Sequence, residues 1–355
     1  MGSDNGAAAV RRINTAVCWA ALRRLGDASV AELAAAVGLS RPTTQPILRW
    51  LATRGLATRS EWRTAHPGRP AERYAFVSSP LRLGCLDLRR DGTVLGAEID
   101  FTGRMVNVRI IQPEPGVCEP EAWSLAAARA LPAGELDVLV VCVPGVITPD
   151  GRILRMRCVP RWAGRRLSEV LALPSAGRLI AENHVNMVAL AESRMGAGAG
   201  AADQLYLHIA RRLKAGIIIN GRLHRGSMFA AGEGTCLSEP CWPLEPGATD
   251  PVSTANRLLT MVAEPLAVMI ATLDPAIVVL GGPGAELGSD RLRCRLATAV
   301  GAQFSGRAEP ELRLAALGER AALFGAAIRV MEEGGALVLG GEHVSVPNPY
   351  LEETP

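Results

Sequence analysis

The sequence contains a single lysine, Lys214, and arginine supplies all the others of its 38 basic residues. Aromatic residues are also scarce, at 4% of the chain, while the hydrophobic and charged fractions are ordinary for a soluble globular protein. We interpret the preference for arginine as the signature of a GC-rich genome rather than of any function. With 355 residues, the chain is long enough for two or three domains, each with its own core.

Long apolar stretches are missing as well. None reaches the ~18 residues that a membrane-spanning helix requires, and no signal peptide precedes the first predicted helix. We therefore expect a cytoplasmic protein that has no membrane partner. The eight cysteines are scattered through the chain, which favours reduced thiols over a disulfide framework.

The charge is distributed unevenly along the chain. Residues 1–80 carry 11 arginines and 5 acidic residues, a net charge of +6, whereas residues 81–355 carry 27 basic and 30 acidic residues, a net charge of −3. A small basic domain joined to a slightly acidic larger one is typical of a nucleic-acid-binding head on a sensory or catalytic body.

Three helices and a hairpin are predicted in the head. The first helix, residues 10–25, is indicated by apolar residues at helical spacing, namely Val10, Ile13, Val17, Ala21 and Leu25. Ser29 and Glu32 form a capping box that opens the second helix, and Ser40 caps the third after a two-residue turn. Two strands follow around a Pro/Gly-rich tip at residues 66–70, which completes a winged helix-turn-helix. Pro46 is expected to kink the third helix or delay its start.

The third helix is the expected recognition helix for a double-stranded DNA operator. Its start and exposed face carry the residues we expect to meet base edges: Arg41, Thr43, Thr44, Gln45 and Arg49. Arg69, held between Gly68 and Pro70 at the wing tip, is expected to enter the minor groove. The alternative is that these arginines form only a solvated basic face. Because one head covers a short half-site, we expect a homodimer or homotetramer.

The rest of the chain reads as two similar α/β halves. In each half, three strands precede a helix and a further strand. The first half contains strands at 81–88, 94–100, 105–111 and 137–143, with a helix at 119–131. The second contains strands at 204–210, 215–219, 222–225 and 276–280, with a helix at 254–273. A last helix at about 321–335 is expected to pack back, and the tail follows it.

Several motifs together resemble the ROK family of repressors, open reading frames and sugar kinases. They are Arg12 with Asn14, the Gly-Leu-Ser-Arg-Pro-Thr turn at 38–43, the Gly-Arg-Pro tip at 68–70, and Asn183-His184 between a strand and a helix. The likeness covers about residues 10–335. It implies an α/β fold in which the winged head (1–80) precedes a two-lobed actin/hexokinase-like, RNase H-like body. The lobes would be residues 81–195, with the last helix packed against them, and residues 196–320, and the tail would be 336–355.

The chain departs from the family's kinases at three places. Their sugar-binding Asn-Asp pair, in which the Asp removes a proton, is here Asn183-His184. Their two glycine-rich phosphate tips correspond to residues 87–93 and 210–216, where Arg89, Arg90, Arg211, Arg212 and Lys214 replace small residues. We therefore expect a kinase-dead body that performs no phosphoryl transfer and is not an enzyme. It would have no catalytic residue and no cofactor. The turn at 281–284 resembles the family's adenosine-contacting turn but also suits any strand-to-helix link.

The family's zinc signature is also incomplete. After residues 232–235 the chain offers only Cys236 and Cys241, which cannot form a closed tetrahedral site. We therefore expect no metal.

The resemblance leaves a set of candidate effector-binding residues: Gly145, Asn183, His184, Glu233 and Glu245. Two of them have simpler alternatives, since Asn183 could only cap the following helix and Glu233 could be an ordinary loop carboxylate. Arg89 and Arg212, at the two altered tips, would face each other across the cleft. We expect an anionic effector to close the cleft between them, unless these arginines only point into water.

The sequence favours a ROK-family transcriptional regulator whose pseudokinase body senses a sugar, a sugar phosphate or another metabolite. One alternative is an active ROK sugar kinase with a fused DNA-binding head, in which His184 serves as the base. Another is a DNA-binding dimer that needs no effector.

Overall fold

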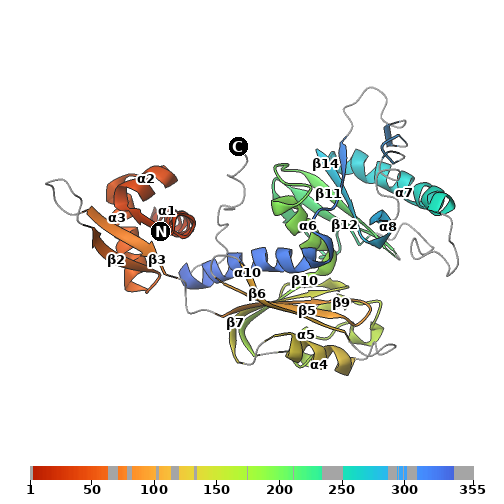
Figure 1. Ribbon diagram of the computed structural model, residues 1–355, viewed down its shortest axis with the longest axis horizontal. Helices are drawn as coiled ribbons and strands as arrows, with labels where there is room; N and C mark the ends of the chain where they lie inside the picture. Colours follow the sequence, from red (N-terminus) through yellow and green to blue (C-terminus); the bar gives the residue numbers. More distant parts are fainter. Residues whose placement is uncertain are drawn as a thin grey trace.

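The computed structural model describes residues 3–62, 71–77, 82–100, 104–112, 120–131, 134–173, 175–210, 212–233, 251–286, 294, 296–298, 300–301 and 310–339. Within them the chain forms a small N-terminal head and a body with two β-sheets, and the head lies at one end of the body (Figure 1). In this part of the chain, no helix is both long and apolar enough to cross a bilayer.

The head has three helices and a three-stranded sheet. The helices are α1 (Ser3–Leu25), α2 (Val30–Val37) and α3 (Arg41–Thr53), and the strands are β1 (Asp27–Ser29), β2 (Ala57–Trp62) and β3 (Ala71–Phe76) in the order β1-β3-β2. The predicted capping box opens α2, since the Ser29 hydroxyl accepts from the Glu32 N–H and the Glu32 carboxylate accepts from the Ser29 N–H. Local sequence signals therefore set this turn.

Helix α3 begins at Arg41 with Ser40 as its N-cap, as predicted, and Pro46 lies inside it rather than at a break. Helix α1 differs from the expected pattern. Val10, Ile13 and Leu25 are exposed, and the buried side of the helix is made instead by Ala16, Cys18, Trp19 and Leu22. The apolar stripe predicted from spacing therefore follows the wrong face at both ends of the helix.

The first sheet of the body has the order β10-β7-β4-β5-β6. Its strands are β4 (Leu83–Leu88), β5 (Val94–Ile99), β6 (Met105–Ile111), β7 (Leu136–Val143) and β10 (Ala176–Asn183). Strands β4, β7 and β10 are parallel to one another, and β5 and β6 continue antiparallel. Helix α4 (Pro120–Ala130) covers one face, and the small elements beside it are β8 (Val146–Ile147), β9 (Ile153–Arg155), η1 (Pro160–Trp162) and α5 (Leu167–Val170).

The second sheet repeats this plan with the order β13-β12-β11-β14-β15. Its strands are β11 (Gln204–Ile209), β12 (Leu213–Ile219), β13 (Arg222–His224), β14 (Ile277–Gly281) and β15 (Glu311–Leu314). Helix α7 (Pro251–Leu273) packs on one face, and the short α8 (Pro283–Glu286) follows β14. The predicted α/β body with two like halves is confirmed by these two sheets.

Two helices lie between the sheets (Figure 1). Helix α6 (His184–Met195) packs on β12 and on α10 (Ala321–Leu339), and α10 packs on β4 and β7 and contacts α1 of the head. The short η2 (Gly318–Arg320) leads into α10. One buried apolar cluster runs without a break from α1 through α10 to α6. The head and the body therefore share part of their core.

Candidate functional site

A cavity of about 940 Å³ opens between the two sheets. Its walls come from the β4–β5 turn, the segment around β9, the start of α6, strands β11 and β12, the β14–α8 turn and the segment that leads into α10. The predicted ligand residues Gly145, His184, Glu233, Arg89 and Arg212 all line it. This volume is within the usual range of small-molecule binding sites.

Asn183 lies at the junction of β10 and α6, where it caps the helix as one of the two alternatives proposed, and it is not among the residues that line the cavity. Its side-chain oxygen caps α6 by accepting from the N–H groups of Val185 (2.8 Å) and Asn186 (3.3 Å). Its amide nitrogen donates to the Gly145 carbonyl (2.7 Å) and to Glu233 Oε1 (2.8 Å). Because Asn183 is buried and its amide is fully engaged, its effect on the cavity is to hold Glu233 in place.

Glu233 joins the two lobes. Its Oε1 accepts from Asn183 and from Lys214 Nζ at 2.8 Å, and its Oε2 is 3.9 Å from Arg155 Nη2. Gly232 makes this placement possible, because it has a φ of +76° and a Cβ there would lie 1.8 Å from the Ala215 carbonyl oxygen. The single lysine of the chain therefore lies in the cavity wall, paired with a carboxylate that is itself tied to the other lobe.

His184 extends into the cavity from the start of α6. Its ring contacts Asp87, a buried carboxylate near the end of β4. The His184 Nδ1 and Asp87 Oδ1 are 2.7 Å apart, and Arg89 Nε donates to Asp87 Oδ2 at 3.3 Å. Burial alone would raise the pKa of Asp87, but the His184 ring and the Arg89 guanidinium outweigh it and hold that pKa below its ordinary value. This pair leaves Nε2 as the ring nitrogen of His184 that Asp87 does not engage.

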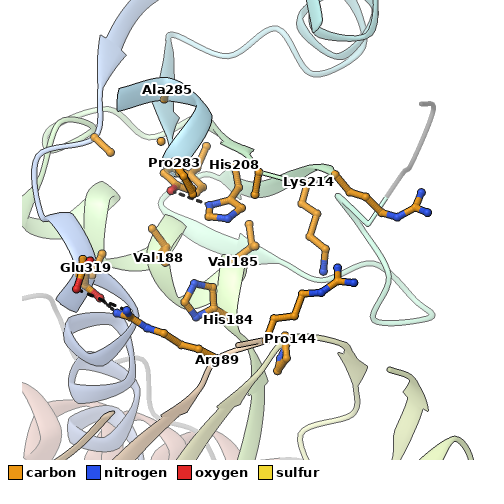
Figure 2. A pocket seen from close by; sticks show the side chains of 18 of the residues that line it. Arg89, Pro144, His184, Val185, Val188, His208, Lys214, Pro283, Ala285 and Glu319 are labelled. Atoms are coloured by element: carbon orange, nitrogen blue, oxygen red, sulfur yellow. Dashed lines mark hydrogen bonds and ion pairs between the residues drawn. The ribbon is translucent and has the colours of Figure 1, made fainter. Parts of the chain in front are cut away.

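Arg89 is turned away from the middle of the cavity. It donates to the Glu319 carbonyl, and its Nη1 lies 3.6 Å from the Glu319 carboxylate, as Figure 2 shows. His184, His208 and Lys214 point instead toward the same open space (Figure 2). Arg89 therefore links the β4–β5 turn to the segment that leads into α10. The two altered tips differ in this respect, because Arg89 is turned away from the middle of the cavity whereas Lys214 points into it.

The cavity wall below the glycine turn at residues 281–282 is occupied by side chains of β11. A Cβ on Gly281 would lie 2.3 Å from the Tyr206 hydroxyl, and one on Gly282 would lie 2.7 Å from the Ile209 carbonyl oxygen. Close packing within the protein is therefore enough to explain why glycine occupies these two positions.

Burial lowers the pKa of His208 to about 3, and His184 and Lys214 act in the same direction, so the His208 ring is neutral at ordinary pH.

Two buried acids near the site were missed from the sequence. Glu182, next to Asn183, pairs with Arg225, which follows β13, and with Arg329 on α10. Glu192, near the end of α6, accepts from the N–H groups of Ala197, Ala316 and Leu317 at 2.8–2.9 Å. A signal was present for Glu182, since it is a charged residue that directly follows the apolar run at residues 179–181.

The predicted DNA-contacting residues are placed differently along α3. Arg41, Thr43 and Arg49 are exposed, and Gln45 is half-buried. Thr44 is fully buried and donates to the Ser40 carbonyl at 3.0 Å, so it packs inside the head and cannot meet a base in this conformation. Gln45 and Arg49 lie beside Glu72 and Tyr74 of β3.

Some predicted residues lie outside the described part of the chain. These are Arg69 at the wing tip, the second possible sugar-contacting acid Glu245, the tip residue Arg211, and Cys236 with Cys241. Among the residues that the structure describes, no three His, Cys, Asp or Glu side chains gather as a metal site would require.

Part of the body is similar to proteins of a known family. Residues 125–236 match the model of the ROK family. A β-glucoside kinase from Listeria monocytogenes is 34% identical over 142 residues, which are 39% of this chain and 47% of that protein. The N-acetylgalactosamine kinase AgaK from Shewanella is 23% identical over 244 residues, which are 55% of this chain and 78% of that protein. The chain thus spans about half the length of the β-glucoside kinase it matches.

Solved structures show the same fold. A ROK family transcriptional regulator, described as a homologue of the E. coli MLC protein, superposes with a TM-score of 0.65 at 16% identity and covers 94% of this chain and all of its own. The ROK hexokinase from Thermus thermophilus has a TM-score of 0.54 at 23% identity and covers 70% of this chain and 97% of its own. These likenesses establish the actin/hexokinase-like architecture of the body.

The expectation that the chain is not an enzyme is contradicted by these comparisons. The curated relatives are named as sugar kinases, and the similar structures include a hexokinase. The replacement of the Asp by His184 and the loss of the glycines at two tips were therefore too little ground to exclude catalysis. Residues 125–236 of this chain match the ROK family model, and the body has the fold of the ROK hexokinase.

Proposed function

We propose that the chain is a DNA-binding transcriptional regulator whose ROK-type body binds a small molecule between its lobes. The observation that carries this proposal is the head itself. Helix α3 presents Arg41 and Thr43 at an exposed, Ser40-capped start, next to the paired strands β2 and β3, in a region with a net charge of +6. In a winged helix-turn-helix, this end of the second helix of the motif enters the major groove.

The whole-chain likeness supports the same function. The similar regulator structure covers 94% of this chain, whereas the hexokinase structure covers 70%. We infer that the additional coverage comes from the head and that the chain works in the same general way. Paired heads on a two-fold operator would then require a homodimer or homotetramer.

Helix α10 gives the cavity a physical route to the head. Arg89 in the cavity wall bonds to Glu319 just before α10, and α10 contacts α1 within one continuous apolar cluster. A ligand that prefers one arrangement of the lobes would shift α10, and the head with it, only as far as that preference allows.

The DNA-binding proposal predicts a specific loss in Arg41→Ala. The full chain is first used to enrich binding sites from a pool of randomised duplexes, which is expected to yield a two-fold symmetric sequence. Arg41→Ala should then weaken binding to that duplex by about 1–3 kcal/mol and relax the base preference at one position of each half-site. Arg222 on β13, which is exposed and outside the cavity lining, supplies the control variant Arg222→Ala. If Arg41→Ala and Arg222→Ala bind equally well, α3 is not the reading helix.

Sugar phosphorylation is the second candidate function, and the Asp87–His184 pair favours it. A hydroxyl group held beside Glu233 could lose its proton to His184 Nε2 as its oxygen attacks the terminal phosphorus of a donor. A new P–O bond forms and the shortened donor leaves. Asp87 would orient the ring through Nδ1 and stabilise the imidazolium formed in that step.

This second function is tested by measuring hexose-dependent consumption of ATP by the full chain. Turnover should fall at least ~100-fold in His184→Asn, because the Asn amide can still donate to Asp87 but cannot take up a proton. Turnover that survives His184→Asn would rule out His184 as the base.

A further inference from the structure

The cavity carries more positive than negative charge, and the excess is concentrated on one side. Six of its lining residues are cationic: Arg89, Arg90, Arg155, Arg157, Arg212 and Lys214. Four are acidic: Asp91, Glu192, Glu233 and Glu319. The partners of these groups decide which charges remain for a ligand.

The side of the cavity next to α10 is already neutralised. Arg89 is bonded to Asp87 and Glu319, and Glu192 is satisfied by backbone N–H groups. An anion would gain little there, because Arg89 would have to give up two carboxylate contacts to receive it. This argues against the anion site expected between the two altered tips, one of which is the Arg89 tip.

The opposite side is different. Arg155 and Lys214 share the single carboxylate of Glu233, and Asn183 already donates to the same oxygen as Lys214. Arg157 and Arg212 make no ion pair within the described part of the chain, although both line the cavity. Four cations therefore face one carboxylate.

This imbalance identifies the ligand class. We propose that the cavity binds an organic anion, a hydroxylated molecule whose carboxylate or phosphate lies among Arg155, Arg157, Arg212 and Lys214. Arg155 and Arg157 come from the segment around β9, and Arg212 and Lys214 come from the β11–β12 turn and β12, so the anionic group bridges the two lobes. The cavity volume of about 940 Å³ leaves room for an organic body beside the charged group.

Glu233 gives the site its selectivity. Within the described part of the chain, its Oε2 has only the distant Arg155 contact at 3.9 Å, so it can accept a hydrogen bond from a hydroxyl of the same ligand while its other oxygen holds Lys214 in position. An inorganic anion would use the cations but not this acceptor. The inference rests on the proposed ligand-binding role of the body and adds the charge of the ligand to it.

The single lysine makes the test direct. The full chain is treated with an acetylating reagent, and the rate of modification of Lys214 is followed by mass spectrometry of the peptide that contains it. Glucose, gluconate and glucose 6-phosphate are compared as millimolar probes at matched ionic strength, because salt alone screens charges. We expect gluconate, glucose 6-phosphate or both to slow acetylation of Lys214 several-fold, and glucose to leave it unchanged.

The variants separate a cationic site from general protection. In Arg157→Ala/Arg212→Ala, the concentration of the anionic sugar that protects Lys214 should rise about tenfold or more, since charge-assisted hydrogen bonds are lost. Arg222→Ala should leave it unchanged. A difference between gluconate and glucose 6-phosphate shows which anionic group the site accepts.

Two results would overturn the inference: equal protection by glucose and the anionic sugars, or no protection by any of the three. Binding to the selected DNA duplex is measured on the same preparations. If the chain selects DNA but Lys214 is not protected in this way, the anionic ligand is ruled out while the proposed DNA-binding function stands.

Discussion

His184→Ala is expected to lower the free energy of unfolding by about 3 kcal/mol near neutral pH. The carboxylate of Asp87 is completely buried, and His184 Nδ1 at 2.7 Å is its shortest contact. Removing one partner of a buried pair leaves the other charge incompletely compensated, which typically costs about 3–5 kcal/mol. Arg89 remains 3.3 Å from Asp87, so we expect the lower end of that range.

The pH dependence of this effect has a definite sign. The folded-state pKa of Asp87 lies below its ordinary value, so the ionised carboxylate stabilises the fold above about pH 4, its unfolded pKa. That contribution is lost as the pH falls through the folded-state value. The difference between wild type and His184→Ala in urea unfolding should therefore shrink in acid.

Two variants frame this measurement. His224 on β13 is exposed, so His224→Ala should unfold at the same urea concentration as wild type. Adding Asp87→Asn to His184→Ala should recover part of the loss, because no buried charge remains. If His184→Ala also unfolds like wild type, the pair does not hold β4 and α6 together.

Glu182→Ala is expected to destabilise the body by about 3–5 kcal/mol, since it removes the buried carboxylate that pairs with both Arg225 and Arg329. Glu182 lies on β10, Arg225 follows β13 of the other sheet, and Arg329 lies on α10, so the loss affects three parts at once. Glu182→Gln should have an intermediate effect, because it keeps the shape and a hydrogen-bond acceptor.

The appropriate control is Glu135→Ala, which removes an exposed carboxylate from the same lobe. Both variants are compared by urea unfolding and by hydrogen exchange of α10. Glu182→Ala should raise exchange in α10, and Glu135→Ala should not. Equal unfolding midpoints for the two variants would show that the interaction of Glu182 with Arg225 and Arg329 contributes no net stability.

The architecture of the body could be predicted from the sequence because apolar strands and helices alternate in the same order twice. The two sheets have corresponding strand orders, and their lengths follow the apolar stretches closely. The head elements were also predictable, since Ser29, Glu32 and Ser40 are local capping signals that tertiary contacts do not override.

Burial within the head was less predictable. Helical spacing predicts that Thr44 faces inward, whereas its place at the start of the third helix made it a candidate base contact, and it is fully buried. Val10 and Ile13 were predicted as core residues and are exposed. Helical spacing identifies a stripe but does not say which neighbouring element covers it. In α1 the deciding contacts come from α2, α3 and β3, which the spacing within α1 itself does not reveal.

Most of the residues of the site could be predicted from the sequence, but the ion pairs and hydrogen bonds between them could not. Gly145, His184 and Glu233 do line one cavity, and Asn183 bonds to two of them. The contacts of Asp87 with His184 and of Glu182 with Arg329 join residues about 100 and 150 positions apart in the sequence, so no local pattern could reveal them. The enzyme question depended on motif loss alone, which is why that prediction failed.

The most direct test of the regulator account is the affinity of the full chain for its selected duplex. It is compared with a scrambled duplex of the same length and base composition, by fluorescence anisotropy over a series of salt concentrations. The account predicts that the selected duplex binds about a thousandfold more tightly or better at physiological salt, with both affinities falling as salt rises. Equal affinity for the two duplexes at every salt concentration would contradict it, because the head would then bind DNA only through its charge.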